Sequence, residues 1–212
     1  MLSKLLLSLG LVAVLNSQAY AHPVAYANSN SIMTWNSKEM SDWMFTHTFA
    51  PTYSLSARYL RMETTSGKRT FYIPHFNFLA KRWNELDSQA NIYLSVGHGG
   101  EKVNNSLKNT SFLAFESDWE SRKYYVSFKQ EALLAYNHRP NLYVTKARAG
   151  FAPYLAEFNE LNSWIILEVS KQSKTQDNFM LTPMVRFFYH NVLTEFGVSQ
   201  KGAAQFNLMV HF

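Results

Sequence analysis

AAQFNLMVHF, residues 203–212, closes the chain and contains its clearest pattern. Apolar side chains occupy every second position of the last eight residues, and mostly polar ones alternate with them. The apolar set is Phe206, Leu208, Val210 and Phe212, and the other set is Gln205, Asn207, Met209 and His211. A period of two predicts a β-strand with one apolar face and one mostly polar face. The strand runs to an aromatic last residue, whereas the termini of soluble domains usually fray into polar residues.

In this alternation and in Phe212, the stretch resembles the closing strand of bacterial outer-membrane β-barrel proteins. The resemblance is sharp over these ten residues and extends over the rest of the chain as a pattern. It implies an outer-membrane location, contact with outer-membrane lipid, and insertion by the barrel-assembly machinery. Phe206, Leu208, Val210 and Phe212 would then form the membrane-insertion signature.

The amino-terminal residues 1–21 have the pattern of a secretory signal peptide. Lys4 precedes an apolar stretch over 5–15, and Ala19 and Ala21 supply the small residues of a cleavage site. We expect cleavage after Ala21, with cleavage after Ala19 as the alternative. The remaining residues 22–212 fit a single domain, and the chain contains no cysteine, so no disulfide contributes to its stability.

Composition narrows the class of protein further. The mature chain has no run of 18 apolar residues, so no transmembrane helix is expected and a membrane location requires a closed barrel. Loss of Lys4 lowers the formal charge from +5 to +4, with 19 basic against 15 acidic residues. This small, evenly spread excess argues against nucleic acid as a partner.

Dyad alternation recurs along the whole chain in segments separated by turn residues. Twelve segments are predicted as strands: 31–35, 43–49, 53–59, 71–84, 90–97, 113–120, 124–131, 143–151, 164–169, 179–189, 192–199 and 205–212. The first and the eleventh are the weakest, and ten strands is the alternative. Residues 22–30 are interpreted as a periplasmic lead-in, and 36–42, 98–110 and 171–177 as longer polar loops on the outer side. The predicted fold is all-β, a closed antiparallel up-and-down transmembrane β-barrel.

A second pattern is independent of the alternation. Aromatic residues flank the turns that this topology assigns to the periplasmic side: Phe49, Tyr53, Trp83, Trp119, Tyr124, Tyr154 and Tyr189, with Phe212 at the same level. Such a ring is typical of the aromatic girdle at a membrane interface. A soluble β-sandwich or lipocalin-like barrel would also alternate, but the girdle, the signal peptide and the terminal Phe212 favour the membrane barrel.

The polar face of the strands would line the lumen of this barrel. Its predicted lining residues are Arg58, His75, Lys81, Glu116, Asp118, Glu120, Lys129, Glu131, Lys146, Arg148, Glu168 and Arg186. Neighbouring strands carry opposite charges, which predicts either a ladder of ion pairs that fills the lumen or a polar pore with opposed charged walls. The size resembles that of the small twelve-stranded channels for acidic sugars, but the mixed sign of the lining argues against an anionic substrate.

The expected function is therefore that of a small passive diffusion channel for a polar solute, or of a structural envelope protein, without a cofactor. One alternative is an outer-membrane hydrolase that uses His98 and His138 at the rim, with Ser106 and Ser111 as neighbours. Another is a copper- or metal-binding envelope protein in which His22 is the amino-terminal ligand. Met33, Met40, Met44 and His47 follow at irregular spacing, and Pro23 removes the next amide as a ligand.

Overall fold

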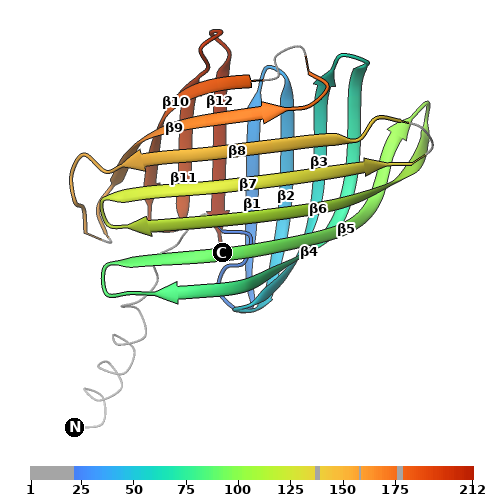
Figure 1. Cartoon of the computed structure of the whole chain (residues 1–212). Coiled ribbons are helices and arrows are strands. Elements are labelled where there is room, and N and C mark those ends of the chain that lie inside the picture. The colour runs from blue at the N-terminus through green and yellow to red at the C-terminus, as the bar shows by residue number, and fades with distance from the viewer. Residues whose placement is uncertain (1–21, 137–138, 158, 176–178) are drawn as a thin grey trace.

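The computed structural model describes residues 22–136, 139–157, 159–175 and 179–212, and all of its regular structure is β (Figure 1). The twelve strands are β1 (Ser29–Ser37), β2 (Met40–Ala50), β3 (Tyr53–Thr64), β4 (Gly67–Asn84), β5 (Ser88–Val103), β6 (Ser106–Ser121), β7 (Tyr124–Ala135), β8 (Leu142–Phe151), β9 (Asn162–Gln172), β10 (Phe179–Tyr189), β11 (Val192–Val198) and β12 (Ala204–His211). Each strand pairs antiparallel with the next, and β1 pairs with β12 to close the barrel. The predicted twelve-stranded barrel is confirmed, and the ten-stranded alternative is wrong.

The closing seam joins β1, one of the two weakest predicted strands, to the strand with the clearest pattern, β12. Their register places Ser31 opposite His211, and the Ser31 Oγ atom lies 2.6 Å from His211 Nδ1. Beyond the last paired strand residue, the Phe212 amide donates to the Asn30 carbonyl at 2.9 Å. The ladder therefore extends to the last residue, as the alternation of residues 205–212 predicts.

The strands are longer than the alternation indicates, because two predicted loops belong to hairpins. Residues 98–110 are not a loop: β5 continues to Val103, a two-residue turn follows, and β6 begins at Ser106. Asn104 and Asn105 have positive φ in this turn, which suits a tight hairpin. Residues 36–42 likewise reduce to a two-residue turn between β1 and β2.

Glycine made 98–110 look like a loop, but the glycines of β5 serve close strand packing. A Cβ atom added at Gly99 would clash with the Tyr72 carbonyl oxygen on β4, and one added at Gly97, directly before this stretch, would lie 2.5 Å from His75 Cβ and 2.6 Å from the Pro74 carbonyl oxygen. A missing side chain thus lets β5 approach β4 closely while it remains in the ladder. In Figure 1, β5 and β6 bend together at this end of the barrel.

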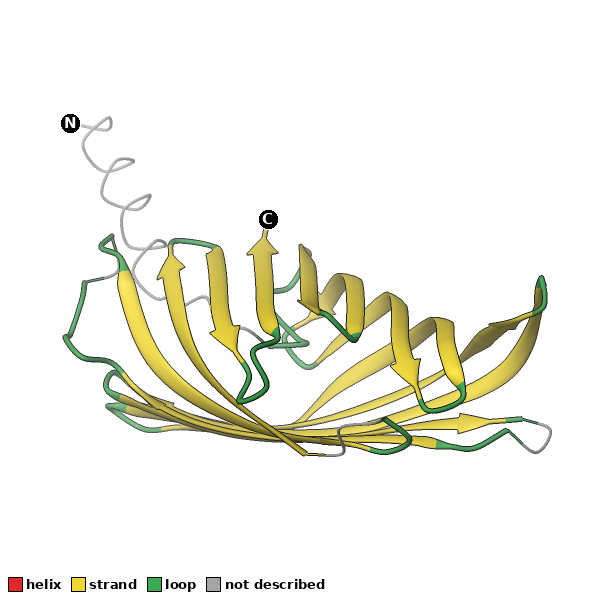
Figure 2. Cartoon of the chain, turned by 90° about the horizontal axis from the view of Figure 1, so that it is seen from above, coloured by secondary structure: helices red, strands yellow, loops and turns green. Residues whose placement is uncertain are grey.

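The barrel is flattened (Figures 1 and 2). Strands β4–β9 form one broad wall, and β1–β3 with β10–β12 form the wall that faces it at a steep strand angle. We call the end where β1 begins and β12 ends the terminal end, and the opposite one the far end. Flattening brings strands that are distant in the sheet within side-chain reach of each other.

The outer surface of the barrel is apolar and aromatic. Phe206 of β12 and Phe212, directly after it, are exposed, while Gln205, Asn207, Met209 and His211 are buried inside. All eight predicted girdle residues are exposed: Phe49, Tyr53, Trp83, Trp119, Tyr124, Tyr154, Tyr189 and Phe212. By strand direction, they all belong to the terminal end. No helix long and apolar enough to cross a membrane occurs among the described residues.

The interior also contains apolar clusters that the alternation does not predict. At the far end, the far apolar cluster consists of Leu60, Met62, Phe71, Ile73, Phe112, Leu133, Leu142 and Val144. A second cluster, formed by Met33, Met44, Leu193 and Met209, lines the wall made by β1, β2, β11 and β12. Two of the methionines weighed as copper ligands are thus packing residues.

The segment before β1 is not a lead-in outside the barrel. His22, Pro23 and Val24 are buried, and Val24 packs against Leu79 and Tyr93 inside the terminal end. Only from Tyr26 does the chain become exposed before it enters β1. The interpretation of residues 22–30 as a lead-in is therefore wrong for the first four residues. The predicted signal peptide, 1–21, lies outside the described residues.

Candidate functional site

The lumen is crossed near its centre by Arg58 of β3. Its guanidinium binds Asp42 on the neighbouring β2, with Nε–Oδ1 and Nη2–Oδ2 distances of 2.9 and 2.7 Å. It also reaches β7 on the opposite wall, where Nη1 and Nη2 lie 3.2 and 3.1 Å from the Glu131 carboxylate oxygens. One buried arginine therefore satisfies two carboxylates and ties the two walls together.

Lys129 extends this network along β7. Its ammonium lies 3.0 Å from Glu131 and 3.5 Å from Glu116 on β6. It also lies 5.6 Å from the centre of the Trp35 ring on β1, across the lumen. The Lys129–Glu116 pair is one of the cross-strand contacts that the alternating charges of β6 and β7 predict.

A second charged group surrounds Glu195 of β11. Arg186 of β10 donates to its carboxylate at 2.8 Å, and Asn207 of β12 donates at 2.6 Å. Arg148 of β8 reaches it at 3.2 Å and also binds Glu168 of β9 at 2.7 Å. Glu195 thus collects three donors from three strands, which keeps a buried carboxylate charged and in place.

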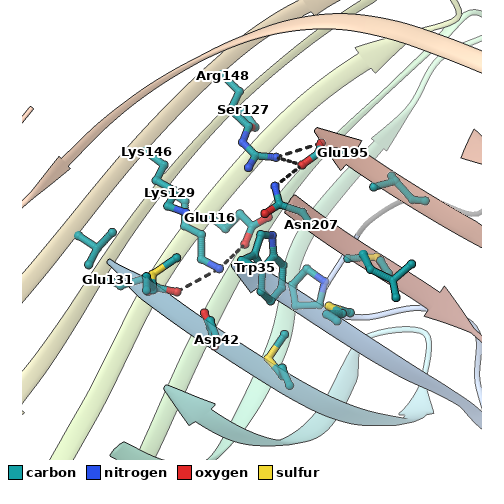
Figure 3. Close-up of a pocket in the computed structure, with 18 of the residues that line it drawn as sticks. Trp35, Asp42, Glu116, Ser127, Lys129, Glu131, Lys146, Arg148, Glu195 and Asn207 are labelled. Carbon is teal, nitrogen blue, oxygen red and sulfur yellow. Dashed lines mark hydrogen bonds and ion pairs between the residues drawn. The ribbon is translucent and has the colours of Figure 1, made fainter. Parts of the chain in front are cut away.

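Between these two groups lies a cavity of about 90 Å³ (Figure 3). Its lining includes the aromatic side chains of Trp35 and Tyr125, the Ser127 hydroxyl, and Lys146. Figure 3 shows side chains of both charged groups reaching this space, with Lys129 and Arg148 on one wall and Asp42 and Glu195 on the other. At about 30 Å³ per molecule in liquid water, the cavity has room for a few waters or one small polar solute.

The far end of the lumen is capped by three charged side chains. Arg69 of β4 binds the Glu101 carboxylate of β5 at 2.8 and 2.6 Å. Arg139, from the connection between β7 and β8, binds the same carboxylate at 3.1 and 2.7 Å. Because Arg69 also donates to the Pro140 carbonyl at 2.8 Å, the cap holds this connection over the far apolar cluster.

The terminal end holds a different group, centred on His22. Its ring nitrogens lie 3.4 Å from Asp118 Oδ2 and 3.9 Å from Glu120 Oε1, and its ring stacks on Tyr93. Burial lowers the pKa of the His22 ring to about 3, and the positive field of Arg82 acts in the same direction. The ring is therefore neutral at neutral pH.

Most of the predicted lining residues lie on the inner face. Arg58, His75, Asp118, Glu120, Glu131, Glu168 and Arg186 are buried, and Glu116, Lys129, Lys146 and Arg148 line the cavity. Lys81 differs, because the β4–β5 register shifts between Leu79 and Lys81 and inverts the alternation there. Its side chain is exposed on the outer surface, with the ammonium 5.7 Å from the Trp83 ring centre.

Several residues of the lumen are not in the predicted set. Asp42 and Glu195 are partners of the two central arginines, and Trp35 and Tyr125 line the cavity. Glu195 shares the inward parity of Leu193 and Gly197, which the pairing of β11 with β10 fixes. Tyr125 shares the parity of Ser127 and Lys129, which is a signal that the sequence does contain.

The alternative sites gain no support from the geometry. His98 lies in β5 and faces outward, with its Nδ1 atom 3.3 Å from the Ser111 hydroxyl. Ser106 opens β6 at the far tip, and His138 lies outside the described residues. Within the described parts of the chain, no three His, Cys, Asp or Glu side chains converge as a metal site, His22 included.

No family model matches the sequence, and no curated protein matches it. Among solved structures, "KdgM porin in complex with disordered oligogalacturonate" is 12% identical, covering 87% of this chain and 98% of that one, with a TM-score of 0.50. "KdgM porin" is 12% identical over the same shares, with a TM-score of 0.49. A loop-deletion mutant of OmpT, an outer membrane protein of Vibrio cholerae, is 8% identical, covering 87% and 97%, with a TM-score of 0.33. The chain has the fold of bacterial outer-membrane β-barrels, as its last strand indicates.

Proposed function

We propose that the chain is an integral outer-membrane protein of the porin-like kind, which admits small polar solutes or ions through a narrow lumen. The apolar outer wall and the girdle at the terminal end support a place in the bilayer, with the terminal end in the periplasm. The barrel-assembly machinery would recognise β12 through Phe206, Leu208, Val210 and Phe212. Outer-membrane lipid would contact the exposed face of every strand.

The observation that carries the channel is the cavity between the two charged groups. Lys146 and the Lys129–Glu116 pair face this space, so that both signs of charge border a path of molecular width. Charged walls of this kind select solutes by field and by width. The acidic oligosaccharide held by the KdgM porin is not carried over to this chain, because Arg58, Arg148 and Arg186 are already paired with carboxylates.

A structural envelope barrel is the second candidate, and the ion pair between Arg58 and Glu131 favours it. This contact joins β3 to β7 across the lumen, and the far apolar cluster fills the space beyond it. A lumen crossed in this way conducts only if the contact opens. The two candidates therefore differ in whether the folded barrel passes current.

Single-channel recording in planar bilayers distinguishes them. A heat-modifiability gel first establishes that the refolded chain, residues 22–212, is a barrel. Discrete current steps support the channel, and they should increase in size in Glu131→Gln, which weakens the crossing contact. Lys81→Gln is the matched control, because it removes one charge from the outer surface. A folded barrel that is silent both as wild type and as Glu131→Gln contradicts the channel and leaves the structural role.

A further inference from the structure

Residues 22–25, the amino-terminal segment, occupy a built site inside the terminal end. The Ser54 hydroxyl donates to the Pro23 carbonyl at 2.7 Å, and the Ala25 amide donates to Thr48 Oγ1 at 3.2 Å. Val24 is buried against Leu79 and Tyr93. Polar contacts from β2 and β3 and apolar contacts from β4 and β5 thus fix the segment in the lumen.

Two buried carboxylates face the first residue of this segment. The side chains of Asp118 and Glu120 are only 2% and 10% exposed. Asn91 donates to Asp118 Oδ1 at 2.7 Å, but Asp118 Oδ2 and Glu120 Oε1 accept no hydrogen bond from any residue that the structure describes. Buried carboxylate oxygens without donors are costly, so this site favours a cationic donor.

The nearby side chains do not provide that donor. The His22 ring is closest, but its pKa of about 3 leaves it uncharged at neutral pH. Arg82 and Arg186 are the cations that act on these carboxylates: Arg82 donates to Asn91 at 2.6 Å and to the Tyr93 hydroxyl at 3.2 Å, and Arg186 donates to Glu195 at 2.8 Å. Arg82 therefore supports the wall of the site while both of those carboxylate oxygens stay without a hydrogen bond.

We propose that the site holds the chain's own mature amino terminus, and that signal-peptide removal after Ala21 thereby locks residues 22–25, the plug, against the inner wall of the terminal end. Hydrolysis of the peptide bond between Ala21 and His22 consumes one water, leaving a carboxylate on Ala21 and an α-ammonium on His22. That ammonium belongs to the residue whose ring already lies beside Asp118 and Glu120. Its three N–H groups would donate hydrogen bonds to Asp118 Oδ2 and Glu120 Oε1, which accept none from the ring.

The inference rests on export to the outer membrane, as proposed above, but not on conduction. It also separates the two cleavage positions. Cleavage after Ala19 would leave Tyr20 and Ala21 in front of His22, and the residue beside the carboxylates would then carry an uncharged amide. The mass of the chain isolated from membranes should therefore correspond to residues 22–212.

The lock can be tested by labelling, because the chain contains no native cysteine. Val24→Cys introduces one thiol into the plug, and its reaction with a water-soluble maleimide reports whether the plug is seated. Three refolded chains are compared: one beginning at His22, the same chain acetylated on its α-amino group, and one beginning at Tyr20. Acetylation removes the charge without altering any side chain.

The free amino terminus should protect the thiol best, and the acetylated and extended chains should label about tenfold faster, as expected for the loss of one buried charge-assisted contact. In an Asp118→Asn/Glu120→Gln background, acetylation should make no further difference. Equal labelling of the three chains, or a mature chain that does not begin at His22, overturns the lock. Rapid maleimide labelling of Val24→Cys in the folded chain that begins at His22 overturns the plug. If that thiol is protected but the barrel passes no current in planar bilayers, only the proposed channel is overturned.

Discussion

Arg58 on β3 and Glu131 on β7 face each other across the lumen, although β4, β5 and β6 separate their strands in the sheet. Both groups are buried, and the contact has two N–O distances of 3.2 and 3.1 Å. Antiparallel neighbours alone would not produce it. The flattened cross-section does, and the contact in turn holds the two walls at this spacing.

Replacement of Arg58 should therefore destabilise the barrel strongly. Arg58→Gln leaves the buried Asp42 without its cation and Glu131 with Lys129 alone, at an expected cost of about 3–5 kcal/mol in the free energy of unfolding. Urea unfolding of the refolded protein in lipid vesicles measures this cost. Lys81→Gln, on the outer surface, should change stability by less than about 0.5 kcal/mol. Equal stabilities for the two variants would show that the crossing contact contributes nothing.

The alternation of the sequence could predict the strands and most inward-facing side chains, since strand geometry fixes side-chain direction with a period of two. It failed at Lys81, where a register shift between Leu79 and Lys81 inverts the parity. One irregular residue in a strand is enough for that, and nothing in the local sequence marks it. The partner of Arg58 could not be predicted either, because the contact depends on how flat the closed barrel is.

The outward face of β4 provides a test of the membrane location. Phe76 is 56% exposed near the middle of this strand, so an arginine there would enter the hydrocarbon core. Phe76→Arg should reduce stability in vesicles by about 2–4 kcal/mol. Leu86→Arg is the matched control, because Leu86 is fully exposed in the turn between β4 and β5 and lies beyond the strand ends. Similar effects at both positions would argue against a bilayer around β4.

The alternation also failed to predict the apolar residues inside the barrel, for a different reason. Near Phe71 and Ile73, both parities of the strand are apolar, so the pattern does not distinguish inside from outside, and near Leu60 and Met62 the charged Arg61 occupies the outward parity, which reverses the expected pattern. All four side chains are buried in the far apolar cluster. A two-sided apolar run in a barrel strand thus indicates a filled section of the lumen, which is a signal that can be read only once the barrel is assumed.

Gly97 should tolerate no side chain, because the β4 atoms that a side chain would meet are held by the backbone and cannot rotate away. Gly97→Ala would bring a methyl group against the Pro74 carbonyl oxygen and the His75 Cβ atom. We expect a loss of about 1–3 kcal/mol in urea unfolding, as for other overpacked sites. At Gly100 the three nearest atoms belong to the Leu107 side chain, with its Cβ atom closest at 3.1 Å, so an added methyl group would overlap its neighbours less than at Gly97. Gly100→Ala should therefore cost less, and the reverse order would contradict the close approach of β4 and β5.

The charges that border the cavity should set its ion selectivity in opposite directions. Glu116 and Lys146 both line this space and are less buried than the central arginines. Glu116→Gln removes a negative charge and should favour anions, whereas Lys146→Gln should favour cations. A single charge about 4 Å from a passing ion in a water-like medium changes its energy by about 1 kcal/mol, or roughly fivefold in permeability ratio. Reversal potentials under a salt gradient measure the ratio, and Lys81→Gln should leave it unchanged because that charge lies outside the barrel. If the two cavity variants shift the potential in the same direction, or not at all, ions do not pass between Glu116 and Lys146, and the conducting path through this cavity is wrong.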